Sequence, residues 1–131
     1  MVCDCRSGRF TVLERIQELP DNVLGFEAKG EVTGADYETV LIPAVEDMLA
    51  RQKVIRFLYF LGNEFTGFDV KAMWDDAKVG LQHLNSWERI AVVSDVRWIH
   101  TTMNAFRFVI PGYVRVFRTS ELAEAKQWIC E

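Results

Sequence analysis

The sequence predicts an α/β domain in which a mostly parallel, five-stranded sheet has helices packed around it, in the order ββαβαβαβα. Short, almost continuously apolar segments alternate with longer segments whose apolar residues recur at helical spacing, which is typical of βα units. Strands separated by whole helices have to be parallel. Half of the 131 residues are apolar, and no repeat or flexible linker divides the chain. We therefore expect one domain over residues 1–131, with residues 1–8 flexible.

The first two strands are predicted to form a hairpin, because residues 10–17 favour a strand and residues 19–22 form a turn cluster. Apolar and polar residues then alternate through residues 24–29. A first helix follows to about Lys53, and Thr33 fits a capping box at its start together with Asp36. Pro43 lies inside this helix, where a proline costs about 3 kcal/mol. We therefore expect a kink or a broken turn there.

Three βα units complete the predicted fold. Residues 54–61 read as a strand buried on both faces, residues 62–68 as a loop, and Asp69 as the cap of a helix that continues to about residue 84. A second buried strand at residues 90–93 is followed by a helix that Asp95 can cap.

The last unit is a strand at residues 113–117 and a helix capped by Thr119 or Ser120. The inward side chains predicted for this helix are Leu122, Ala125, Trp128 and Ile129. Right-handed crossovers place helices around the sheet, and we expect its strands to lie in sequence order. Residues 10–17 are then the antiparallel edge of the sheet, and residues 113–117 are the opposite edge.

Charge, apolar run lengths and cysteine content indicate which partners and which cellular compartment to expect. The net charge is −4 and no basic stripe is present, which argues against a nucleic-acid partner. The longest apolar runs are far shorter than the roughly 20 residues of a transmembrane helix, and the N-terminus has no apolar signal core. Three cysteines, with Cys3 and Cys5 one residue apart, indicate a reducing compartment. We expect a soluble, cytoplasmic protein of undetermined oligomeric state.

Catalytic, metal and cofactor motifs are absent from the sequence. No phosphate-binding loop or nucleophile elbow occurs, and two histidines without a cysteine pair at zinc spacing do not make a metal site. Ser94, Asp95 and His100 suggest a triad, but Asp95 is explained as a helix cap. Asp75 and Asp76 are adjacent on a helix and point about 100° apart, so they cannot face each other. We expect no enzymatic activity, no cofactor and no metal.

Two aromatic segments form the candidate site. Residues 64–69 follow the carboxyl end of a central strand, where α/β sheets bind ligands, and residues 106–112 stay apolar beyond the end of a helix. Together with Trp74 and Trp98, which flank the apolar stripes of their helices, they can line an apolar groove, or they can pack as ordinary core. The candidate ligand-binding residues are Phe65, Thr66, Gly67, Phe68, Asp69, Trp74, Phe106 and Phe108.

From about Asn22 to Trp128 the chain resembles the SpoIIAA-like branch of STAS domains, the fold of sulphate transporters and anti-sigma-factor antagonists. The resemblance rests on Gly30-Glu31-Val32-Thr33, Asp36-Tyr37, Leu41-Ile42-Pro43-Ala44, Phe65-Thr66-Gly67-Phe68-Asp69, Met73-Trp74-Asp75-Asp76, Trp87 to Asp95, Trp98-Ile99, Phe106 and Pro111-Gly112. Antagonists of this fold carry a phosphorylated serine at the helix start. Here Phe68 and Asp69 stand at that point, and Thr66 is the nearest hydroxyl.

The resemblance implies a domain that binds rather than catalyses. CRAL-TRIO lipid-binding domains have a similar fold, which implies an apolar ligand or contact with a membrane surface. We therefore expect a non-enzymatic domain that binds an apolar small molecule or lipid in a groove near residues 64–69 and 106–112. The alternative is a protein-interaction module of anti-sigma-factor-antagonist type that lacks the phosphoserine switch and binds a regulatory protein.

Overall fold

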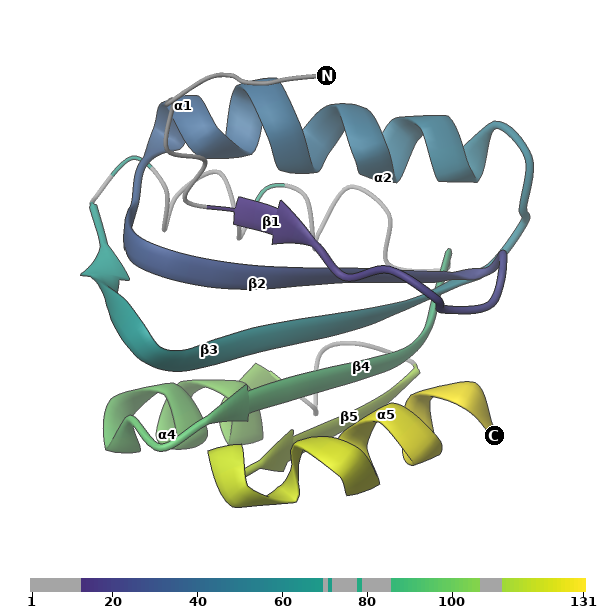
Figure 1. Cartoon of the computed structure of the whole chain (residues 1–131). Helices are drawn as coiled ribbons and strands as arrows, with labels where there is room; N and C mark the ends of the chain where they lie inside the picture. The colour runs from purple at the N-terminus through teal and green to yellow at the C-terminus, as the bar shows by residue number, and fades with distance from the viewer. Residues whose placement is uncertain (1–12, 70, 72–77, 79–85, 107–111) are drawn as a thin grey trace.

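Five strands form one sheet in which neighbours in the sequence are neighbours in space (Figure 1). The computed structural model describes residues 13–69, 71, 78, 86–106 and 112–131. The strands are β1 (Leu13–Arg15), β2 (Val23–Val32), β3 (Ile55–Phe68), β4 (Trp87–Ser94) and β5 (Tyr113–Phe117). The first pair is antiparallel and the other three pairs are parallel. The predicted hairpin, strand order and edges are confirmed.

The helical segments alternate with the strands as predicted. They are α1 (Gly34–Asp36), the π-helical turn η1 (Tyr37–Leu41), α2 (Ile42–Leu49), α4 (Arg97–Phe106), the 3-10 turn η3 (Thr119–Glu121) and α5 (Leu122–Cys130). Lys71 and Lys78 are also helical. The rest of the helix predicted after Asp69 lies outside the described residues.

The start of the first helix confirms the predicted capping box, but the kink or broken turn expected at Pro43 is wrong. The Asp36 N–H donates to the Thr33 hydroxyl oxygen at 3.3 Å, and the Thr33 N–H donates to the Asp36 carboxylate at 2.8 Å. The N–H of Ile42 donates to the carbonyl of Tyr37, which makes the wide turn of a π-helix, and Pro43 then lies in the first turn of α2. A wider turn leaves room for the proline ring, so the helix continues without a break.

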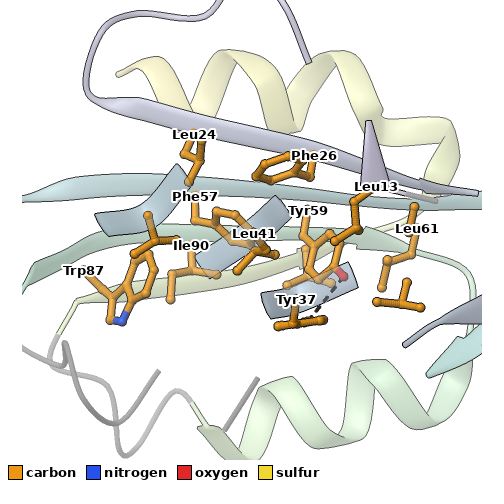
Figure 2. Packing of buried hydrophobic residues seen from close by; sticks show 14 of the residues in the cluster. Leu13, Leu24, Phe26, Tyr37, Leu41, Phe57, Tyr59, Leu61, Trp87 and Ile90 are labelled. Atoms are coloured by element: carbon orange, nitrogen blue, oxygen red, sulfur yellow. Dashed lines mark hydrogen bonds between the residues drawn. The ribbon is translucent and has the colours of Figure 1, made fainter. Parts of the chain in front are cut away.

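Successive side chains of a strand point to opposite faces of the sheet, so the buried residues form two clusters, one on each face. The first face is packed against η1, α2 and α4, and Figure 2 shows its centre. It carries Leu24, Phe26, Phe57, Tyr59, Ile90, Val92 and Val114. The second face is packed against α5, which lies on the opposite side of the strands from α2 (Figure 1). It carries Val23, Leu58, Ala91, Val93 and Phe117 beneath Ala125 and Ile129.

Arginines on the second face hold the end of α5. Arg56 donates to the carbonyl of Ile129 at 2.8 Å and to the Glu88 carboxylate at 2.7 Å. Arg89 donates to the carbonyl of Trp128 at 2.6 Å. The last carbonyls of a helix have no partner within the helix and carry partial negative charge, so guanidinium groups stabilise this end.

The predicted loop at residues 62–68 is wrong, because β3 continues as a strand through Phe68. Beyond Leu61 the strand loses β4 but keeps β2, with Phe65 opposite Gly30 and Phe68 opposite Val32. The register shifts on both sides of Gly30, whose φ is 110°, and the extra residues at these irregularities belong to β3. The glycines and polar residues that suggested a loop belong to a two-stranded extension of the sheet.

Two predicted helix caps are also wrong. The Asp95 carboxylate accepts hydrogen bonds from the backbone N–H of Thr119 at 3.0 Å and from its hydroxyl at 2.6 Å. Arg118 takes the cap position before η3, and its N–H donates to the Glu121 carboxylate at 2.8 Å. Since β4 and β5 are parallel neighbours, their carboxyl ends meet, and the polar residues after the two strands bind each other rather than their own helices.

Candidate functional site

Aromatic rings gather where β3 extends beyond the end of β4, at the carboxyl end of the parallel strands. Phe65 and Phe68 come from the extension of β3, and their ring centroids are 5.0 Å apart. The indole of Trp98, from the first turn of α4, lies edge-on to Phe68 at 6.2 Å. Thr66 is exposed between the two phenylalanines in the sequence. We call these four residues the aromatic edge.

The base of the aromatic edge is buried core. Phe68 packs edge-on against Tyr59 at 6.1 Å and against Tyr37 at 6.5 Å. The hydroxyls of these two tyrosines lie 3.3 Å apart, and Figure 2 marks this contact. Tyr59 continues the row through Phe57 at 5.4 Å to Trp87, a further 6.0 Å away. A continuous row of rings therefore runs through the core and ends at the surface.

The tyrosines were missed as site residues by sequence reasoning. Tyr59 follows Phe57 at the two-residue spacing of one strand face, and this signal indicated its direction. Nothing local indicated that Tyr37, which follows the capping box of the first helix, would meet it. That contact depends on how α1 and η1 lie over the sheet.

The structure places the predicted site residues in different settings. Phe65 and Phe68 are half-buried and packed against the core, so the structure brings them together. Gly67 has φ 139°, and a Cβ placed there would meet no atom within 4 Å among the described residues other than its two chain neighbours. The N–H of Asp69 donates to the carbonyl of Val32 at 2.9 Å, which ends the pairing with β2. Trp74, Phe108 and the side chain of Phe106 lie outside the described residues.

The residues of the suggested triad do not form a relay. Ser94 is fully buried, and its hydroxyl oxygen accepts from the N–H of Val96 at 3.0 Å. His100 Nε2 is 2.5 Å from the carbonyl oxygen of Ser94, so this nitrogen donates and does not act as a base toward the hydroxyl. Asp95 is bound to Thr119, whose hydrogen bonds lower the pKa of the carboxyl. Asp75 and Asp76 lie outside the described residues.

Within the described residues, no group of three His, Cys, Asp or Glu side chains could hold a metal ion. No helix in that part of the chain has the length and apolar character needed to cross a membrane. Cys130 is an exposed free thiol, whereas Cys3 and Cys5 lie outside the described residues.

Comparisons with known proteins agree on the fold. A family model described as SpoIIAA-like matches residues 23–130. An uncharacterized protein with a SpoIIAA-like fold from Shewanella loihica PV-4 is similar in structure, with 27% sequence identity and a TM-score of 0.75. The similarity covers 96% of this chain and 100% of that chain. The comparison with curated proteins yields no match.

Proposed function

This chain belongs to the SpoIIAA-like family, and from that premise we propose a non-enzymatic domain that binds a protein partner through the aromatic edge. The observation that carries the proposal is Trp98, which is 45% exposed although its ring contacts the half-buried Phe68. A tryptophan in this position is available to a partner while its inner side is already held. The resemblance of the whole chain to STAS regulators supports binding rather than catalysis.

The packing of the rings favours a protein partner over a small molecule. Small-molecule sites are hollows that enclose most of the ligand. Here the described rings pack against one another, because Phe68 contacts Phe65, Tyr37, Tyr59 and Trp98. Rigid, packed aromatics with an exposed tryptophan at the rim are typical of interface hot spots, since little side-chain entropy is lost on binding.

Gly67 favours a second candidate, an apolar small molecule or lipid. Apart from its two chain neighbours, no atom of the described residues lies within 4 Å of a Cβ placed there, and Phe65 and Phe68 lie in the same strand. In this candidate, an acyl chain or a flat apolar group would lie against Gly67, where no side chain projects. A substitution at Gly67 is a poor test, because its φ of 139° strains any L-residue.

Photo-crosslinking from Thr66 tests the proposal and separates the two candidates. Thr66 is exposed, so a benzophenone side chain can replace it and be irradiated in an extract of the protein's own cells. We expect a protein adduct that disappears in the Trp98→Ser variant. The same probe at the exposed Glu46 of α2 is the matched control and should give no such adduct.

Other outcomes of this experiment are equally decisive. An adduct of a few hundred daltons that needs Trp98 would replace the protein partner by the apolar ligand. Equal adducts at the two probe positions, or adducts that persist without the indole, would reject the aromatic edge as a binding surface. Circular dichroism of each variant verifies that the fold is retained.

A further inference from the structure

The outer edge of β5 is a second surface on which a partner can bind. β5 pairs with β4 from Tyr113 opposite Arg89 to Phe117 opposite Val93. It is the last strand of the sheet, and no described residue pairs with its other side. Alternate N–H and C=O groups of an edge strand point away from the sheet and can pair with a further strand. The opposite edge, β1, has only three residues.

The side chains beside this edge are an exposed ring and an exposed cation. Tyr113 is 71% exposed, and Arg115 is exposed two residues further along the same face of the strand. Val114, between them, is buried on the other face. An added strand would therefore place every second side chain next to Tyr113 or Arg115.

Arg115 is held in place but has no carboxylate partner in the described part of the chain. Its guanidinium lies 4.7 Å from the ring centroid of Phe117 and 5.5 Å from that of Trp128. Stacking on these two rings orients the group without neutralising its charge. The stretch 113–118 contains two arginines and no acidic residue, in a chain whose net charge is −4.

We propose that the open edge of β5 binds an extended segment of another protein by strand addition, with an acidic residue next to Arg115 and an apolar residue two positions away next to Tyr113. Backbone pairing supplies general affinity in this mode, and alternate side chains select the sequence. A second copy of this chain fits poorly. Antiparallel pairing of two β5 strands about their middle residue sets Arg115 against Arg115, and like charges directly opposite each other are unfavourable.

Fluorescence anisotropy with short labelled peptides tests the proposal on the intact chain. The probe is an eight-residue peptide of valine and threonine with a central glutamate and a leucine two positions to either side. We expect it to bind about 5- to 20-fold more tightly than the same peptide with a central lysine. Arg115→Glu should reverse this preference, while Arg51→Glu, a matched charge reversal on α2, should leave it unchanged. N-methylation of alternate peptide nitrogens should abolish binding, because it removes the donors of the strand pairing.

Four results would overturn the inference. They are no binding of the glutamate peptide at about 1 mM, equal binding to wild type and Arg115→Glu, undiminished binding of the N-methylated peptide, or a dimer of the wild type that the peptide does not dissociate. If circular dichroism shows that Arg115→Glu is misfolded, Arg115→Gln replaces it, and the peptide preference should then disappear rather than reverse. Failure here leaves the aromatic edge untouched, since that surface lies at the end of β3.

Discussion

Phe57→Ala should cost about 4 to 5 kcal/mol of unfolding free energy. Removing a buried phenylalanine costs roughly 3–5 kcal/mol, depending on how far the cavity collapses. Phe57 is 7% exposed and contacts three other rings, Phe26 at 6.4 Å, Tyr59 at 5.4 Å and Trp87 at 6.0 Å. Each such ring pair adds about 0.5–1.5 kcal/mol beyond the buried area. The three partners come from β2, β3 and β4, so the cavity cannot close by moving one element, and the upper half of the range applies.

Urea unfolding followed by circular dichroism measures this loss, with the m-value verifying that the unfolded states are comparable. The matched control is Phe60→Ala, three residues along the same strand on the second face, where the ring is only half-buried. We expect the control to lose about 1.5 kcal/mol. A loss below about 1 kcal/mol for Phe57→Ala, or equal losses for both variants, would refute the central position of β3 and the packing of its first face.

Three further changes test other contacts. Hydrogen bonds from Thr119 lower the pKa of Asp95, so this carboxylate stabilises the fold at pH values above its unfolded pKa of about 3.9, and the contribution disappears as pH falls through the lower folded pKa. Urea titrations at pH 6 and pH 2.5 should show a smaller loss of unfolding free energy at the lower pH for Asp95→Asn than for wild type. Gly112→Ala would drive its Cβ into carbonyl oxygens of β4, so we expect a thermal midpoint lower by at least about 5 °C; an unchanged midpoint would contradict the close approach. Arg56→Met removes the hydrogen bond to the carbonyl of Ile129, and a loss of about 1.5–3 kcal/mol with faster amide exchange in α5 is expected; uniform exchange across the chain would argue against a local clamp.

The residues of the aromatic edge could be selected from the sequence, but their secondary structure could not. Phe65 and Phe68 were selected because they follow a central strand, and the structure does bring them together with the predicted flanking ring of Trp98. Their setting was predicted wrongly, since they belong to β3 and not to a loop. Gly67 and its polar neighbours have turn composition, and only pairing with β2 makes the segment a strand.

The sequence by itself determined the elements whose signals are local, namely the hairpin, the capping box at Thr33 and the buried strands. Alternation and helical spacing then imply that the later strands are parallel, because strands separated by whole helices need crossover connections. The tertiary structure alone decided that Asp95 binds Thr119, 24 residues away, and that Tyr37 meets Tyr59 beneath the aromatic edge. A polar group bonds to whichever partner the fold brings within about 3 Å, and no periodicity in the chain encodes that distance.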